Sequence, residues 1–83
     1  MNGSKLEKYI AILQLLLSYG PLPVNDIEGY VNYEQVEVIK DLNFLLRKKL
    51  IVRISHGNSQ RYKTSRYGAK IVNYFIFRKT IPQ

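Results

Sequence analysis

The sequence predicts a single, mostly helical α+β domain in which three helices precede a two-stranded β-hairpin and a fourth helix follows it. Apolar residues recur at helical spacing on both sides of a short segment near residue 50 that is rich in β-branched residues. A cluster of turn-forming residues divides that segment into two strands. With 83 residues, 46% of them hydrophobic, residues 1–83 are expected to build one core and one domain.

The first helix is predicted at about residues 4–19. Ser4 and Glu7 are expected to form a capping box at its start. At its end, Gly20 is expected to adopt the left-handed conformation, and Pro21 cannot continue the helix. Its spacing predicts an inward stripe of Leu6, Ile10, Leu13 and Leu17.

A short second helix is predicted at 24–31 and a longer third helix at 33–49. Asn32 and Gln35 are expected to form the capping box of the third helix. Its core face is predicted to carry Val38, Leu42 and Leu45, with Ile39 and Leu46 beside them. The opposite face then presents Tyr33, Val36, Lys40, Asn43 and Arg47.

A β-hairpin is predicted at 50–64, because the run from Leu50 to Ser55 and the run from Arg61 to Thr64 are β-rich. The five residues His56–Gln60 between them are expected to form the turn. A last helix at 65–79 would face inward with Gly68, Ile71, Val72 and Phe75.

The charges are distributed unevenly along the chain, whose formal net charge is +7. Residues 1–41 contain three basic and six acidic residues, whereas residues 42–83 contain ten basic residues and no acid. A half-chain with one sign of charge repels itself unless a polyanion neutralises it, and nucleic acid is the most common such partner. A solvated basic surface without a partner is the alternative.

Several function classes are excluded by residue types. The chain has no cysteine and one histidine, His56, so neither a thiolate metal site nor a cysteine nucleophile is possible, and we expect no metal and no cofactor. Glycine-rich phosphate loops and the common hydrolase motifs are absent, so an enzyme is not expected. We also expect no membrane span, because no stretch approaches the roughly 20 apolar residues that one requires. A cytoplasmic, nucleoid-associated protein is predicted; a secretion signal at the N-terminus is the alternative, which Gln14 disfavours by interrupting the apolar run.

Two segments carry a resemblance to a known fold family. Residues 41–51, DLNFLLRKKLI, are similar to the end of the recognition helix and the first wing strand of winged helix-turn-helix domains. Residues 62–68, YKTSRYG, are similar to the junction between the second wing strand and the last helix in that family. The pairing is typical of small transcriptional regulators, especially archaeal ones and those related to the PadR and MarR groups. The resemblance covers about residues 4–77 and implies a regulator that binds double-stranded DNA.

The resemblance and the helical geometry together give candidate DNA-binding residues. On the third helix, the residues expected to contact base edges or adjacent phosphates in the major groove are Tyr33, Gln35, Lys40, Asn43 and Arg47. On the wing, the residues expected to contact the backbone or the minor groove are Arg53, His56, Asn58, Arg61 and Lys63.

The chain departs from the family pattern in two respects. Lys49 stands where the family usually has glycine, so the helix must end without the residue that most easily adopts positive φ. Glu34, Glu37 and Asp41 lie on the expected recognition helix, where carboxylates would oppose phosphates. Two alternatives to a sequence-specific regulator therefore stay open: a winged-helix protein–protein interaction module and a weakly specific, nucleoid-type DNA binder.

The first and last helices have second apolar stripes that a small monomer cannot bury entirely. A homodimer formed by pairing these helices is predicted, with an interface of Ile12, Leu15, Tyr19, Tyr67, Tyr74 and Phe77. In the alternative interpretation, these side chains cover the edges of the core in a monomer.

Overall fold

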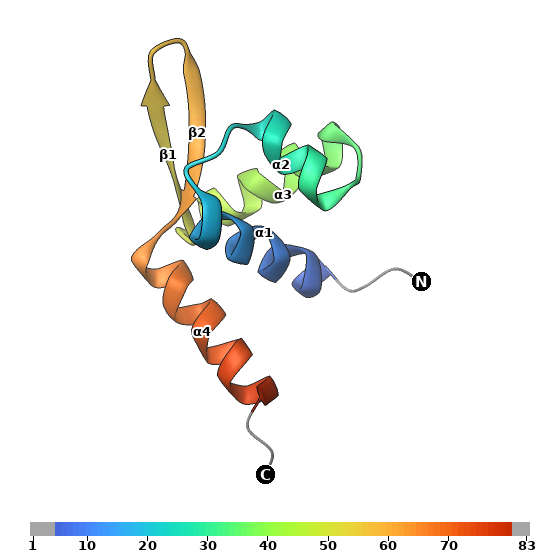
Figure 1. Ribbon diagram of the computed structural model, residues 1–83, viewed down its shortest axis with the longest axis vertical. Helices are drawn as coiled ribbons and strands as arrows, with labels where there is room; N and C mark the ends of the chain where they lie inside the picture. Colours follow the sequence, from blue (N-terminus) through green and yellow to red (C-terminus); the bar gives the residue numbers. More distant parts are fainter. Residues whose placement is uncertain (1–4, 81–83) are drawn as a thin grey trace.

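Four helices and one β-hairpin follow each other in the predicted order, which confirms the mostly helical α+β class (Figure 1). In this computed structural model the described backbone covers residues 5–80, and the described side chains are those of residues 5–55 and 57–75. The elements are α1 (Lys5–Tyr19), α2 (Val24–Val31), α3 (Gln35–Arg47), β1 (Ile51–His56), β2 (Ser59–Thr64) and α4 (Arg66–Thr80). The capping box predicted at Ser4 lies outside the described residues.

The core collects side chains from α1, α2, α3, β1 and α4. Its buried members are Ile12, Leu13, Leu16, Ile27, Val38, Leu42, Leu45, Ile51 and Val72. The predicted inward stripe of α1 was partly wrong, because Leu6 and Leu17 are exposed and the helix is rotated to bury Ile12 and Leu16 instead. α1 packs against α2, β2 and α4 at once, so its buried face is set by several neighbours rather than by one seam.

The ends of α2 and α3 differ from the predicted caps. Asn32 does not cap α3; it adopts the left-handed conformation, with φ of 61°, and ends α2 by donating its backbone N–H to the carbonyl of Glu28. Asn tolerates this conformation better than most residues. The N-cap of α3 is Glu34, so Tyr33 lies in the turn before the helix.

Lys49 adopts the left-handed conformation that the family pattern assigns to glycine, with φ of 63°. The backbone N–H of Lys49 donates to the carbonyl of Leu46, and that of Leu50 donates to the carbonyl of Leu45. These two bonds form a Schellman motif, which ends α3 at Arg47, two residues before the predicted boundary. Gly20, in contrast, has no positive φ and continues the helical bonding of α1.

The hairpin has a tighter turn than predicted. His56 pairs with Ser59, so Gly57 and Asn58 form a two-residue turn rather than the centre of a five-residue loop. Gly57 has φ of 63°, as the first central residue of a type II′ turn requires. At the base of the hairpin, Leu22 and Tyr62 exchange two backbone hydrogen bonds of 2.9 and 2.8 Å, which fasten the α1–α2 connection to β2.

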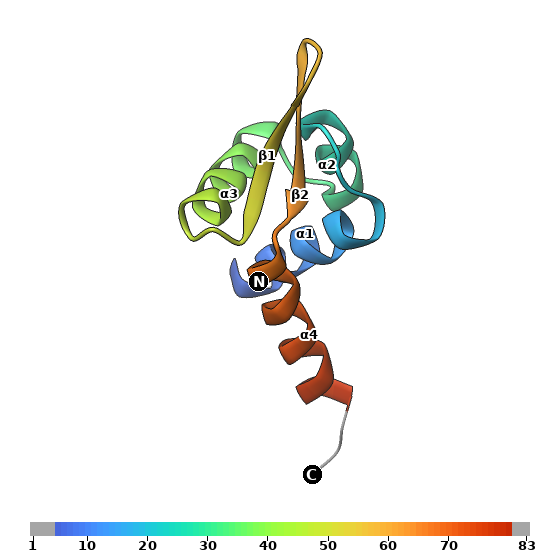
Figure 2. The same cartoon turned by 90° about the vertical axis from the view of Figure 1, so that its left-hand side faces the viewer.

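The junction between β2 and α4 is closely packed. The Thr64 hydroxyl donates to the Leu13 carbonyl at 2.8 Å, and the Ser65 hydroxyl accepts from the Gly68 backbone N–H at 3.0 Å as the cap of α4. A Cβ at Gly68 would collide with the Leu50 carbonyl, so the β1 start and α4 approach closely only because this residue is glycine. The hairpin and α4 then extend in opposite directions from the helical body, along the 48 Å long axis of the molecule (Figure 2).

Candidate nucleic-acid interface

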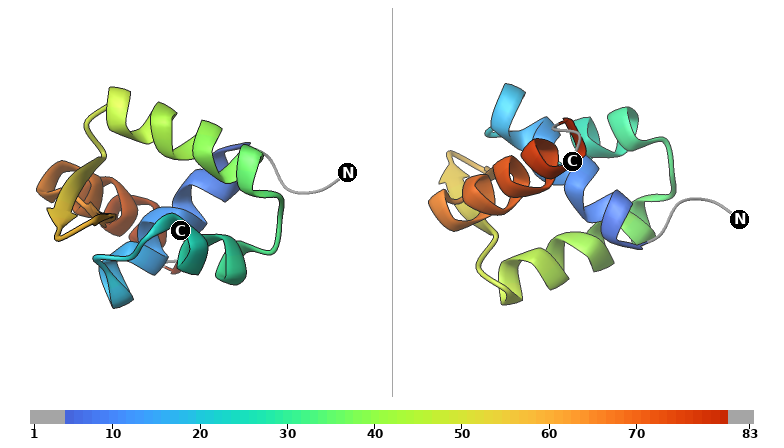
Figure 3. Two further views of the ribbon diagram at one scale, coloured as in Figure 1. Left: turned by 90° about the horizontal axis from the view of Figure 1, so that it is seen from above. Right: turned by 90° about the horizontal axis from the view of Figure 1, so that it is seen from below.

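The outward face of α3 is the first part of the candidate interface. α3 runs along one edge of the helical body, and its C-terminal end lies beside the base of the hairpin (Figure 3). Helical spacing brings exposed side chains of α3 onto one stripe: Val36, Ile39, Lys40, Asn43 and Arg47. Every residue of α3 is described, and this stripe contains no carboxylate.

The acidic residues of this region lie elsewhere. Asp41 points inward and is 1% exposed. One of its oxygens accepts from Lys5 Nζ at 3.2 Å, and the other accepts from the Tyr33 hydroxyl at 3.0 Å. Glu37 is half-buried on the same side of the helix, and Glu34 precedes it as the N-cap. The expected conflict between Asp41 and DNA phosphates is therefore wrong, because folding turns this carboxylate into the protein.

Tyr33 does not lie on the outward face, contrary to its prediction as a base-contacting residue. It is half-buried in the α2–α3 turn, its hydroxyl is bonded to Asp41, and the ammonium group of Lys8 lies 4.7 Å from its ring centroid. Burial and the hydrogen bond to Asp41 raise the pKa of Tyr33 above the ordinary value of 10.0. The hydrogen bond to Asp41 also raises the pKa of Lys5. This cluster joins α1 to α3 behind the outward face.

Gln35 begins α3 and is exposed. Its amide donates to the Asn25 side-chain oxygen at 3.1 Å, which links the first turn of α3 to the first turn of α2. Gln35 therefore lies at the edge of the outward stripe and contributes to the packing of the helix-turn-helix.

The wing is the second part of the candidate interface, and its basic residues lie on two faces. Arg53 pairs with Tyr62, which packs against the core, whereas Arg61 and Lys63 pair with Ile54 and Val52 on the opposite face. Asn58 is exposed at the tip, and the side chain of His56 lies outside the described residues. Arg61 is half-buried, and its Nε is a buried donor without a partner in the part of the chain that the structure describes.

Other basic residues lie away from α3's outward stripe. Lys48 is on the other side of α3, Lys49 is in the following turn, and Arg66 and Lys70 are exposed on α4. The basic half of the chain thus divides in the fold between the α3–wing region and the region around the start of α4. Sequence order alone does not reveal this division.

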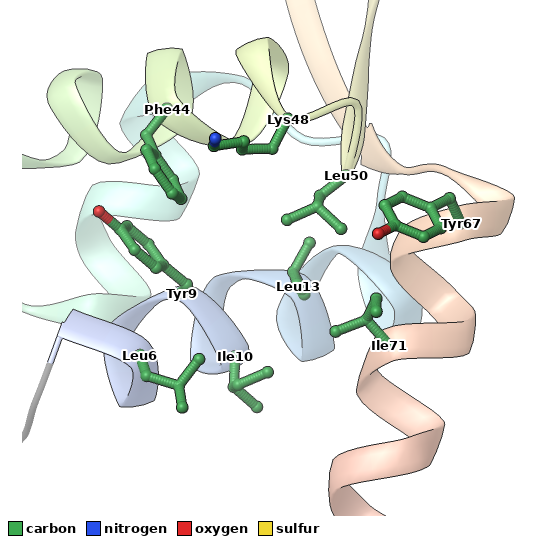
Figure 4. Close-up of a pocket in the computed structure, with 9 residues that line it drawn as sticks. All are labelled: Leu6, Tyr9, Ile10, Leu13, Phe44, Lys48, Leu50, Tyr67 and Ile71. Carbon is green, nitrogen blue, oxygen red and sulfur yellow. The ribbon is translucent and has the colours of Figure 1, made fainter.

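An apolar groove of about 380 Å³ lies between α1, the end of α3 and the start of α4 (Figure 4). Tyr9 and Phe44 stack on its wall with ring centroids 4.5 Å apart. The remaining lining residues are Leu6, Ile10, Leu13, Lys48, Leu50, Tyr67 and Ile71.

The residues predicted to form a dimer interface do not all lie on the surface of the structure. Ile12 is wrong as an interface residue, because its side chain is fully buried in the core. Leu15 is half-buried against the core, and Tyr19 stacks on Tyr30 of α2 with ring centroids 5.7 Å apart. Tyr67 and Tyr74 are exposed on α4, and the side chain of Phe77 lies outside the described residues. The groove that Tyr67 lines is also lined by four residues of α1: Leu6, Tyr9, Ile10 and Leu13.

Within the described residues, His, Asp and Glu form no cluster that could hold a metal ion. Among the same residues, no helix combines the length and the apolar character of a membrane span.

Several solved structures share this architecture, among them one described as the transcriptional regulator SlyA. A MepR variant from S. aureus bound to an oligodeoxyribonucleotide is 26% identical, covers 90% of this chain and 64% of its own, and superposes with a TM-score of 0.76. Streptococcus pneumoniae FabT in complex with DNA is 17% identical over 87% of this chain and 53% of its own, with a TM-score of 0.77. MarR from E. coli is 16% identical over 81% of this chain and 49% of its own, with a TM-score of 0.76. The fold is a winged helix of the MarR type.

The chain spans between 49% and 64% of the length of these three proteins. No protein-family model matches the sequence. No curated protein matches it either.

Proposed function

We propose that this chain is a transcriptional regulator that binds double-stranded DNA, with α3 in the major groove and the wing on the backbone or the minor groove. The observation that carries the proposal is the outward stripe of α3, which holds Lys40, Asn43 and Arg47 and no carboxylate, beside a wing that holds Arg53, Arg61 and Lys63. Amide and guanidinium groups on a helix of this kind match the donors and acceptors of base edges. Two structures of the same fold are complexes with DNA, which supports DNA as the partner.

The roles follow from the positions. Asn43 and Arg47 would contact base edges, and Lys40 and Gln35 would contact bases or the neighbouring phosphates. Arg61, Lys63 and Arg53 would contact the backbone on either side of the ribbon, with Asn58 and His56 at its tip. Tyr33 is left out of this set, because its hydroxyl holds Asp41.

The test is binding to random-sequence duplex DNA, measured by fluorescence anisotropy over a range of salt concentrations. Arg47→Ala and Arg61→Ala should each weaken binding and reduce the salt slope by about one. Lys48→Ala is the matched control, since Lys48 neighbours Arg47 in sequence but lines the groove on the other side of the helix. Unchanged slopes in both arginine variants would remove them from the interface.

We further propose that the regulator is a homodimer formed through α4. Tyr67 and Tyr74 are each 55% exposed, and Leu6 and Ile10 of α1 continue the apolar surface at Tyr67. Phe77 remains part of this proposal by its position in α4, and Leu15 and Tyr19 would lie at its edge. A dimer would align two recognition helices with two half-sites of a palindrome. Sedimentation at micromolar concentration tests this, and a stable species at the 9.7 kDa chain mass would contradict it.

Two alternative functions would give different results in the duplex-binding test. A weakly specific, nucleoid-type binder would bind duplexes with a steep salt dependence but enrich no sequence from a random library. A protein–protein interaction module is favoured by the apolar groove and would show no such salt-dependent duplex binding. A regulator or a nucleoid-type binder would act in the cytoplasm, on the nucleoid.

A further inference from the structure

Two aliphatic side chains occupy the outward stripe of α3 without any role in the core. Val36 is 56% exposed and Ile39 is 43% exposed, while Val38, Leu42 and Leu45 supply the buried face of the same helix. Both residues are β-branched, which slightly disfavours a helix, so helix formation does not explain them either. The sequence pattern had assigned Ile39 to the side of the core face.

The positions of these side chains give the stripe two chemical halves. Val36, Ile39, Lys40 and Asn43 follow the i, i+3, i+4, i+7 spacing of one helix face. The first half of the stripe is therefore apolar, and the second half, which ends at Arg47, carries hydrogen-bond donors and positive charge. A partner of this face needs small apolar groups next to acceptors and negative charge.

Duplex DNA offers this combination in its major groove. The only apolar group that base pairs present there is the C5-methyl group of thymine, and it lies among base acceptors and between two phosphate backbones. We propose that Val36 and Ile39 are specificity-determining residues that contact thymine methyl groups. The proposal rests on the proposed function and adds the class of sequence: sites with thymines opposite the first half of α3.

Charge favours this occupant over a protein surface. The stripe itself contains Lys40 and Arg47, while Asp41 is turned toward Lys5 of α1 and Glu37 lies on the same side of the helix as Asp41. A-form RNA is disfavoured too, because uracil lacks the methyl group and the deep, narrow major groove of RNA does not admit a helix.

The experiment uses the full chain and a duplex enriched from a random library, in which each thymine is replaced in turn by deoxyuridine. This change removes one methyl group and leaves base pairing and charge unchanged. We expect one or two positions at which the wild type binds about 3–5-fold more weakly, the effect of losing one buried methyl contact. Val36→Ala or Ile39→Ala should weaken binding to the thymine duplex by a similar factor. When deoxyuridine replaces the thymine that the missing side chain would contact, the alanine variant should bind that duplex as tightly as it binds the thymine duplex.

Val52→Ala is the matched control, since Val52 is a 41% exposed valine on the wing rather than on α3. That variant should keep the full deoxyuridine effect. Because Val36 and Ile39 are exposed, circular dichroism and thermal melting should show both alanine variants folded as the wild type is.

The failures are distinguishable. Absence of duplex binding by the wild type would contradict the proposed function itself. Duplex binding without an enriched sequence, without any deoxyuridine effect, or with an undiminished effect in both alanine variants would overturn the role of Val36 and Ile39 and leave DNA binding in place.

Discussion

The two faces of α3 differ in burial and in chemistry. The inward face carries the only fully buried carboxylate among the described residues, Asp41, together with the core residues Val38, Leu42 and Leu45. The outward face carries exposed aliphatic, amide and basic side chains and no acid. One 13-residue helix thus presents an apolar and acidic surface to the protein and a mixed apolar and basic surface to the exterior.

This comparison shows why the formal charge of α3 is a poor guide to whether its outward face can bind DNA. A count of charged residues suggests that Glu37 and Asp41 would prevent α3 from binding DNA. They are four residues apart, so they share one side of the helix, and Lys5 and Tyr33 meet Asp41 on that side. Changes to the inward face should therefore affect stability, and changes to the outward face should affect binding.

The largest effect is expected at the centre of the inward face. Leu42→Ala removes a side chain that is 1% exposed, and we expect it to lower the free energy of unfolding by about 2–5 kcal/mol. Val36→Ala, on the outward face, should change it by less than about 0.5 kcal/mol. Urea denaturation of both variants measures the difference. Equal losses would mean that the two faces are not distinguished by burial.

Asp41→Asn should have the next largest effect and lower the free energy of unfolding by about 1–3 kcal/mol, because the buried amide has one acceptor oxygen where the carboxylate accepts from both Lys5 and Tyr33. The duplex affinity of the folded protein and its salt slope should stay unchanged, since Asp41 faces away from the outward stripe. Asn43→Ala is the matched variant two residues away, and it should weaken duplex binding with little effect on stability. A changed salt slope in Asp41→Asn would show that its carboxylate is felt at the binding surface.

Alkaline pH should weaken the inward cluster. The folded state raises the pKa of Tyr33, chiefly through burial, and that of Lys5, through the hydrogen bond to Asp41. The folded chain therefore holds protons that the unfolded chain releases, and the stability from both groups is present below about pH 10 and falls as the pH rises further. Thermal melting between about pH 9 and pH 11 measures the fall, which should be shallower in Tyr33→Phe. If stability falls equally steeply with pH in the wild type and in Tyr33→Phe, the pKa of Tyr33 is not raised by folding.

The order of elements could be predicted from the sequence because each element has its own local signal. The spacing of Val38, Leu42 and Leu45 gave the core face of α3, and the β-rich runs around a glycine gave the hairpin. The same spacing identified Lys40, Asn43 and Arg47 as outward residues, and the structure exposes all three.

What could not be predicted depends on contacts between elements. The burial of Ile12 in place of Leu6 follows from how α1 meets three neighbours. The inward turn of Tyr33 follows from its bond to Asp41, and the exposure of Ile39 follows from where the other helices leave α3 uncovered. A single-helix pattern contains none of these relations.

The smallest expected effect lies where the two faces of α3 end, at Lys49. Its φ of 63° strains a residue with a Cβ, and glycine relieves that strain while it adds freedom to the unfolded chain. Lys49→Gly should therefore raise the free energy of unfolding by about 0.5–1 kcal/mol, measured by urea denaturation. Because Lys49 lies beyond the outward stripe, the salt slope of duplex binding should remain at its wild-type value, in contrast to Arg47→Ala. A reduced slope would place the α3–β1 turn against the DNA backbone and extend the binding surface past the end of the helix.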